Sequence, residues 1–428
     1  MSLELRSRLY EALSEPFIID PHTHINPLAP ASKSLADILG YHYFTELAHS
    51  AGLAKSQIEA DDLAPQEKVE RIFRYLGPLN NTIQYSWFVE IVNSLLGFEV
   101  EVLLPEHAEP LWNKAVELMA DENWEDQVLQ RSHLTAVFLT NDFDDRLEGF
   151  NTERYIPCLR TDDLVFKLAH PSVRERLASC SGHDVTDSAS LEQALRDRFQ
   201  VFKNRGARAC AISLPPHFAP RPVSTARADR ALGQLATKGR DADASDQEAA
   251  GYAVFWKLAE LCQEYRLPFD LMIGVNRSVY AAGVYQGQDL YDSRVSLIQY
   301  QQLFNAFPEV RFPISVLASV TNQELASYAW IFPNVIANGH WWYSNTPTYI
   351  EHDLAARLEA IPRTKQIGYY SDMYKLEFAL PKFNMYKRIL AKVLAERYVQ
   401  DRGWSEERAA DLGLQVLQRN TSIIFPVN

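Results

Sequence analysis

Short apolar runs alternate with amphipathic helical patterns along most of the chain. Each run is bounded by Pro, Gly, Asn or Asp, as is typical of strands buried on both faces of a parallel sheet. Eight such strands alternating with helices predict an α/β fold, a (β/α)8 TIM barrel. A doubly wound open sheet is the alternative, but no G-x-G-x-x-G follows the first run. The runs are "FIIDPHTHI" (17–25), "LTAVFLTND" (134–142), "YIPCLRTDD" (155–163), "RACAISLPP" (208–216), "PFDLMIGV" (268–275), "RFPISVLA" (311–318), "NVIANGHWW" (334–342) and "QIGYYSDM" (366–373).

Two segments interrupt this rhythm. Residues 35–130 separate the first and second runs and carry apolar residues at three- and four-residue spacing, which predicts a helical insertion after the first strand. Residues 221–250 are polar, charged and poor in aromatic residues, and we expect a mobile loop there. Because strands continue on both sides of each segment, we interpret residues 1–428 as a single barrel domain.

The bulk composition argues against some classes of partner. The 428 residues are 47% hydrophobic and 23% charged, which is an ordinary globular composition. Lysine and arginine number 42 against 55 acidic residues, a formal net charge of −13. A chain this acidic has no general attraction to phosphate backbones or anionic membranes, so we expect neither nucleic acid nor a membrane as a partner. An anionic substrate would need local basic residues or a metal ion.

The cysteines and the N-terminal stretch predict a cytoplasmic protein. Cys158, Cys180, Cys210 and Cys262 stand far apart, which favours reduced thiols over a zinc knuckle or a disulfide framework. Residues 1–16 are amphipathic and carry acids, without the apolar core of a signal peptide. The oligomeric state is left open, and a homo-oligomer is compatible with this composition.

The first predicted strand ends in "DPHTH", which places two histidines two residues apart. Side chains alternate across a strand, so the imidazoles of His22 and His24 face one side and could hold one metal ion. A short His-x-His match also arises by chance, and a pair of surface histidines in a loop is the alternative. Asp20 shares their face and would either orient one of the imidazoles or cap a turn.

Polar residues at the ends of other strands favour the metal site. Active sites of such barrels gather at the C-terminal ends of the strands, and Asp372 ends the last strand, which lies beside the first when the barrel closes. Two histidines and an aspartate that leave coordination positions open are typical of a catalytic metal site. We therefore expect His22, His24 and Asp372 to bind one divalent metal, Zn²⁺, with Mn²⁺ or Fe²⁺ as alternatives.

Eight motifs spread over nearly the whole chain carry a family resemblance: "DPHTHI", "GYHYF", "FLTNDFDD", "CLRTDDL", "AISLPPHF", "LMIGVNRSVY", "GHWWYSNTP" and "YYSDMYKLEF". In this order they resemble the uronate (glucuronate) isomerase family, a branch of the amidohydrolase superfamily of metal-binding barrels. The chain looks closest to a divergent subgroup of that family. The tryptophan pair and the serine–aspartate of the last strand are the more specific marks, because His-x-His alone indicates only the superfamily.

The resemblance implies an enzyme of carbohydrate metabolism that isomerises a hexuronate reversibly between aldose and ketose, as from glucuronate to fructuronate. The sugar acid would bind the metal through its carboxylate and a neighbouring hydroxyl, while a hydrogen moves between C2 and C1. The catalytic residues implied are Asp372, His42 and Tyr43, with Tyr43 as a donor to the reacting oxygens. Packing within the helical insertion is the alternative reading of His42 and Tyr43.

The resemblance also implies residues that bind the substrate. Arg160 would pair with substrate oxygens through its guanidinium fork, or would form only an ion pair with a nearby aspartate. Trp341 and Trp342 would wall the pocket, or would simply pack in the core.

The sequence departs from the family pattern at two positions. Where the family has a histidine on the fifth strand this chain has Met272, so we expect a mononuclear site. Where the family has an arginine two residues after the aspartate, this chain has Tyr374, followed by Lys375 on the other side of the strand. We expect Tyr374 to contact the substrate, and His340, just before the tryptophan pair, to offer a further polar group.

Two other functions remain open at this point. A mononuclear metal-dependent hydrolase would use the same His22, His24 and Asp372 to activate water. A non-catalytic sugar-acid binder would keep the pocket without the chemistry, and Tyr374 is the departure that favours it. The barrel fold alone does not decide among them.

Overall fold

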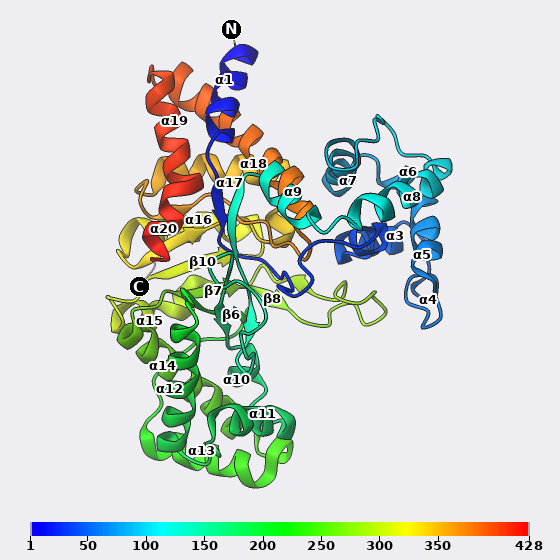
Figure 1. Ribbon diagram of the computed structural model, residues 1–428. Coiled ribbons are helices and arrows are strands. Elements are labelled where there is room, and N and C mark those ends of the chain that lie inside the picture. The colour runs from blue at the N-terminus through cyan, green and yellow to red at the C-terminus, as the bar shows by residue number, and fades with distance from the viewer. Residues whose placement is uncertain (1, 427–428) are drawn as a thin grey trace.

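The structure is a computed structural model that describes residues 2–426, and its centre is a ring of parallel strands surrounded by helices (Figure 1). One sheet has the strand order β1-β2-β4 and the other β12-β11-β10-β7-β6-β5-β3. Because β2 with β3, and β4 with β5, are successive pieces of the same chain segments, the two sheets together form one barrel with eight strand positions. Its strands are β1 (Ile18–Asp20), β2 (Leu134–Phe138), β3 (Asn141–Asp142), β4 (Tyr155–Ile156), β5 (Cys158–Arg160), β6 (Ala209–Leu214), β7 (Phe269–Ile273), β10 (Phe312–Val316), β11 (Val335–Asn338) and β12 (Gln366–Ile367).

The strands lie within the eight apolar runs, and their composition explains why they sit at the centre. All residues of β7, β10 and β11 are buried, because each strand has helices on its outer face and the barrel interior on the other. Burial of apolar side chains on both faces offsets the conformational entropy that these short strands lose on folding.

The barrel closes between its last and first strands without a regular ladder, since β12 and β1 are end strands of their respective sheets. Backbone hydrogen bonds beyond the strand ends join the two segments instead. The amide of Asp372 donates to the carbonyl of His22 at 3.1 Å, and the amide of His24 donates to the carbonyl of Met373 at 2.8 Å. We call this junction the seam.

Helices that follow the barrel strands cover its outer surface (Figure 1). A further hairpin, β8 (Val275–Asn276) with β9 (Leu290–Tyr291), extends from the end of β7. No helix within residues 2–426 combines the length and the apolar character that crossing a bilayer requires. The outer helices are α10 (Asp162–Phe166), α11 (Pro171–Ser181), α12 (Ser188–Asn204), α13 (Thr225–Lys238), α14 (Ala244–Tyr265), α15 (Gln301–Ala306), α16 (Asn322–Ile331), α17 (Pro347–Ala360) and α18 (Ala379–Val393), with α1 (Ser2–Ser14), α19 (Glu406–Leu414) and α20 (Asn420–Ile424) from the two ends of the chain.

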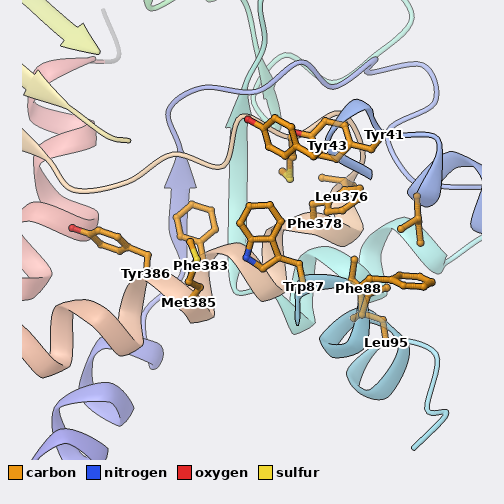
Figure 2. Close-up of a cluster of buried hydrophobic side chains, with 14 of the residues drawn as sticks. Tyr41, Tyr43, Trp87, Phe88, Leu95, Leu376, Phe378, Phe383, Met385 and Tyr386 are labelled. Atoms are coloured by element: carbon orange, nitrogen blue, oxygen red, sulfur yellow. The ribbon is translucent and has the colours of Figure 1, made fainter. Parts of the chain in front are cut away.

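The segment between β1 and β2 is helical and lies to one side of the barrel (Figure 1). Figure 2 shows how aromatic rings of this segment, among them Tyr41, Tyr43 and Trp87, face Phe378 and Phe383 from the end of the chain. This shared core joins the segment firmly to the barrel, because large aromatic side chains bury much apolar area. Its helices are α2 (Leu35–Leu39), α3 (His42–Ser50), α4 (Lys55–Ile58), α5 (Pro65–Phe73), α6 (Leu76–Leu79), α7 (Ile83–Ser94), α8 (Ala108–Met119) and α9 (Trp124–Arg131).

The structure differs from the sequence-based expectation at residues 221–250, where we expected a loop. Most of this segment is helical, because α13 spans Thr225–Lys238 and α14 begins at Ala244. Helix α13 buries Ala228, Ala231, Leu232 and Leu235. These four residues lie on one face at helical spacing, which is enough to hold a helix against α14. The apolar pattern of this face is weak in the sequence, because two of its four residues are alanines and charged residues surround them.

A glycine in the segment between β11 and the tryptophan pair allows the barrel core to pack. Gly339 has φ +50°, and a Cβ there would lie 2.2 Å from Cδ1 of Tyr370. Both the left-handed conformation and the lack of space therefore require glycine. We expect Gly339→Ala to lower the free energy of unfolding by about 2–5 kcal/mol, measured by chemical denaturation.

Gly182→Ala is the matched control, because Gly182 also has a positive φ, +75°, but has open space where a Cβ would stand. It should lose only about 1–2 kcal/mol for the backbone conformation. Equal losses in the two variants would contradict the packing argument for Gly339.

Candidate functional site

His22, His24 and Asp372 meet at the seam, at the C-terminal end of the barrel strands. Nε2 of His24 lies 3.3 Å, and Nε2 of His22 3.6 Å, from Oδ1 of Asp372. One ligand atom from each residue lies within 4.8 Å of the others. Nε2 of His22 and Oδ1 of Asp372 are buried and have no hydrogen-bond partner within the described chain. Such atoms are costly unless something binds them, so this donor set fits a metal ion.

The protonation states of these residues also suit metal binding. Burial, together with the charge of His24, lowers the pKa of His22 to about 3, so its imidazole is neutral and offers a lone pair. Burial alone would raise the pKa of Asp372, but the close imidazole of His24, 3.3 Å away, and the ammonium of Lys382 outweigh burial and lower the pKa to about 2. A neutral imidazole and an ionised carboxylate are the forms that bind divalent metals.

Three neighbouring side chains hold these ligands in orientation. Thr140 Oγ1 lies 2.8 Å from Nδ1 of His24, which leaves Nε2 to face the other ligands. Tyr43 donates its hydroxyl hydrogen to Oδ2 of Asp372 at 3.3 Å. Oδ2 of Asp270 lies 3.9 Å from Nδ1 of His22. Each ligand therefore has a polar neighbour on the side away from the shared centre.

Asp20 binds backbone rather than an imidazole. Its Oδ1 accepts the amide hydrogens of Ser371, at 3.1 Å, and of His22, at 3.4 Å. Of the two roles expected from the sequence, the structure therefore favours the turn cap, which here fastens the seam beneath the site. Burial raises the pKa of Asp20 to about 7.

A cavity of about 170 Å³ opens over the three ligands. Arg160 lies in its wall and its Nε donates to Oδ2 of Asp162 at 3.1 Å, so the expected ion pair is present and the guanidinium also faces the cavity. Met272 lines it at the position of the absent fifth-strand histidine. The predicted site residues that line the cavity are His22, His24, His42, Arg160, Trp341, Trp342, Asp372 and Tyr374.

His42 is the first residue of α3 and reaches the cavity from the helical segment. Its Nε2 lies 4.0 Å from Oε1 of Glu46, and burial lowers the pKa of His42 to about 3. Burial raises the pKa of Glu46 to about 8, so this pair can hold a proton near neutral pH. The ring of Trp342 packs edge-on against His42, with centroids 5.6 Å apart. The pair has the composition of an acid–base group.

Two predicted site residues lie elsewhere than expected. Tyr43 is buried outside the cavity lining, so its hydroxyl meets the Asp372 carboxylate rather than the space for a substrate. His340 is only 1% exposed and is also outside the lining, packed near Tyr386 with ring centroids 6.1 Å apart. The peptide turns at Gly339, so His340 points into the core and does not offer a polar group to the cavity.

Some residues of the site were not assigned a role from the sequence. Thr140 lies near the end of the second predicted strand and Arg277 just after the fifth, where the barrel rule directs attention, but neither was predicted to take part in the site. Asp270 had a clearer signal, since it is a charged residue inside an apolar run. Gln286 had none, because it lies in a loop whose path only the structure reveals.

Comparisons with known proteins identify a family and a fold for this chain. A family model described as glucuronate isomerase matches residues 1–416. A uronate isomerase of Nostoc punctiforme is 21% identical over 91% of this chain and 89% of its own length. The solved uronate isomerase of Thermotoga maritima has a TM-score of 0.88 and 20% identity, covering 99% of this chain and 97% of that one. The solved glucuronate isomerase of Caulobacter crescentus has a TM-score of 0.90 and 18% identity, covering 100% and 95%. These likenesses confirm the predicted barrel fold.

The ligand geometry predicts which substitutions remove metal. His22→Ala and His24→Ala should each abolish retention of divalent metal by the purified protein, measured by elemental analysis, because each removes a ligand atom of the shared centre. Thr140→Val should weaken metal affinity by about 10–100-fold, because it frees the His24 ring.

His217→Ala is the control, since His217 is exposed and lies outside the cavity lining. It should retain metal like the unmodified protein. Undiminished metal in His24→Ala, with the far-ultraviolet circular dichroism of a folded barrel, would show that the ion binds elsewhere.

Proposed function

The chain belongs to the glucuronate isomerase family, whose reaction is an aldose–ketose isomerisation, and on that premise we propose that it isomerises a hexuronate at a mononuclear metal site. The substrate would be a sugar acid of the glucuronate type. One observation carries the proposal. Two imidazoles and a carboxylate converge at the floor of a cavity whose wall contains arginine side chains, which suits a small anion bearing hydroxyl groups.

His22, His24 and Asp372 are the residues that would hold the metal. We propose Zn²⁺, with Mn²⁺ or Fe²⁺ as alternatives, because nitrogen and oxygen ligands suit all three. When bound, the ion would supply positive charge for carboxylate and hydroxyl oxygens of the sugar acid. The methionine at position 272 supports a mononuclear site, because it offers no imidazole to a second ion.

The proton transfer between C2 and C1 needs a group that can both take and return a proton. We assign this step to His42, whose neutral imidazole lines the cavity and has a lone pair free to take a proton. Glu46, whose Oε1 lies 4.0 Å from Nε2 of His42, is the neighbour whose ionised form would stabilise the protonated ring. In the forward direction the base takes the C2 proton, an enediolate forms, and a proton is returned to C1. The O2 hydroxyl proton passes to O1, so that C2 becomes the carbonyl and C1 the hydroxymethyl group of the ketose. The carbon skeleton is unchanged, so no other reactant is required.

The remaining predicted residues orient the substrate and the ligands. Arg160 would bind substrate oxygens and stabilise negative charge that develops on them. Trp341, Trp342 and Tyr374 would limit the volume open to the sugar and exclude water. Tyr43 would act through Asp372, so we assign it a positioning role, in place of the donor role expected from the sequence.

The cytoplasmic location, the absence of nucleic-acid partners and the oligomeric state stay predictions from the sequence. The interpretation of the chain as one domain, with residues 35–130 as an insertion, is likewise our proposal. The aromatic core shared between that segment and the end of the chain supports it.

An isotope experiment tests the proposed reaction. Metal-loaded protein incubated with glucuronate in deuterated water should form the corresponding ketose with deuterium at C1, because the enediolate is protonated from solvent-exchanged acid. Mass spectrometry and proton NMR of the product measure it. The His24→Ala protein is the matched control and should form none.

Several outcomes would contradict the proposal. Ketose without deuterium at C1 would contradict a base whose proton exchanges with solvent. Cleavage of an amide or lactone, with no ketose from any hexuronate, would identify a metal-dependent hydrolase. Glucuronate binding without turnover would identify a sugar-acid binder.

The place of Arg160 in the cavity wall yields a second prediction. Arg160→Met should raise KM for glucuronate by about 10–100-fold, because charged hydrogen bonds contribute more than neutral ones. Arg205→Met, which removes a surface arginine paired with Glu148 at 3.1 Å, should leave KM unchanged. Steady-state kinetics measure both, and equal KM values in the two variants would refute the assignment of Arg160.

A further inference from the structure

A loop from the fifth strand position roofs the cavity and brings in a side chain that none of the motifs contains. Residues 277–289, which we call the roof loop, join β8 to β9 and extend toward α3 and α4 (Figure 1). At its tip Gln286 lines the cavity above the ligands. Gln286 has φ +65°, in the left-handed region that glycine favours. Surrounding contacts must maintain this conformation in a non-glycine residue.

The roof loop is fixed at its base to the barrel. Arg277 Nη1 lies 2.6 Å from Oδ2 of Asp289, and the amide of Ser278 donates to Oδ1 of the same carboxylate at 2.8 Å. Arg277 Nη2 also donates to the hydroxyl of Ser213 on β6 at 3.1 Å. The two ends of the loop are thereby held together over the barrel.

The tip of the roof loop is fixed to the helical segment on the other side of the cavity. Lys55 donates to the carbonyl of Gly283 at 2.7 Å, and the ring of His49 lies 3.2 Å from the hydroxyl of Tyr280. Val284 is 1% exposed and joins the core of that segment. Because the roof loop is held at its base and at its tip, these contacts determine the position of Gln286 over the cavity.

The Gln286 amide lies between two side chains already assigned to the site. Its Nε2 donates to the hydroxyl of Tyr374 at 3.2 Å, and its side chain also interacts with the ring of His42. The ring of Tyr374 in turn stacks on the metal ligand His24, with centroids 4.9 Å apart and an interplanar angle of 28°. These residues form one wall of the cavity, which we call the amide wall (His42, Gln286 and Tyr374).

The amide wall is uncharged, whereas the opposite side of the barrel is not. Glutamine and tyrosine offer hydrogen-bond donors and acceptors without a net charge at neutral pH. Two arginines line the cavity: Arg160 ends β5, and Arg277 contacts Ser213 on β6. The strand order places β5 and β6 on the side of the barrel opposite β12. A carboxylate therefore has partners at the arginines and at the ion that the three ligands would hold, while the amide wall suits a hydroxyl group.

We propose that Gln286 is a specificity-determining residue that hydrogen-bonds a hydroxyl group of the hexuronate from the roof of the cavity. The inference rests on the proposed isomerase function. It places a substrate contact at the amide wall, where Tyr374 stands at the position of the arginine in the family pattern. The amide can both donate and accept, so it distinguishes a sugar that presents a hydroxyl at this point from one that does not.

Kinetics of the metal-loaded protein with glucuronate test the proposal. Gln286→Ala should raise KM by about five- to tenfold with a smaller change in kcat, as loss of one neutral hydrogen bond predicts. Gln286→Glu keeps the length of the side chain but replaces the donor by a carboxylate, and should raise KM further. Tyr285→Ala is the matched control, because Tyr285 is the neighbouring residue, is 75% exposed and lies outside the cavity lining.

A set of monodeoxy glucuronates separates direct contact from a structural role. We expect one deoxy analogue to bind the unmodified protein more weakly than glucuronate does, by the same factor by which Gln286→Ala weakens the binding of glucuronate. That analogue should bind the variant and the unmodified protein with equal affinity. A loop that merely came loose would penalise every analogue in the variant alike. Unchanged KM in Gln286→Ala, or equal losses for all analogues in both proteins, would overturn the proposal.

Failure of the proposed function would appear first and separately, as absence of ketose from the unmodified protein. In that event calorimetric binding of glucuronate and its deoxy analogues to the same proteins decides the role of Gln286. Coupling between the residue and one hydroxyl would uphold the contact, and its absence would refute it.

Discussion

The junction between the last and first strands of the barrel is the constraint on which the site depends. Within the described chain β12 and β1 share no ladder, and the amides of Asp372 and His24 bond across the gap to His22 and Met373 instead. Residues of the proposed metal centre thus also form the closure of the barrel. Asp372 has φ +55°, a conformation that costs an ordinary residue about 1–2 kcal/mol and persists only where neighbours determine it. The centre can therefore form only in the closed barrel.

A buried lysine beneath the seam maintains that conformation. Lys382 donates to the carbonyl of Ser371 at 2.7 Å and to the hydroxyl of Tyr41 at 3.2 Å, and Tyr41 donates to the carbonyl of Asp372 at 2.8 Å. Burial lowers the pKa of Lys382 to about 8, although the charges of Asp372 and Asp20 oppose this shift. The ammonium also lies 4.8 Å from the ring centroid of Trp87, in the aromatic cluster of Figure 2. The helical segment that supplies Tyr41 and Trp87 is consequently part of the site's support.

The sequence predicted the parts of the fold that depend on local pattern and on strand order. Apolar runs identified the strands, and the barrel rule then brought Asp372 beside His22 and His24 although the chain separates them widely. Features that depend on a loop's path or on a single backbone turn could not be predicted. Gln286 reaches the cavity through contacts at both ends of its loop, and a turn at Gly339 sends His340 into the core.

The charges in the cavity explain why a metal and an anionic substrate belong together in so acidic a chain. Arg160 and Arg277 line the cavity with Asp162, Asp289 and Asp372, so aspartates outnumber arginines there. His22 and His42 add no positive charge, because burial keeps both imidazoles neutral. The aspartates therefore offset the charge of the two arginines, and the net charge of −13 of the chain gives an anion no general attraction. A divalent ion on the three ligands would reverse the sign of the local balance. Binding of the sugar acid would then depend on whether the three ligands hold an ion, because that ion would supply the positive charge that attracts the carboxylate.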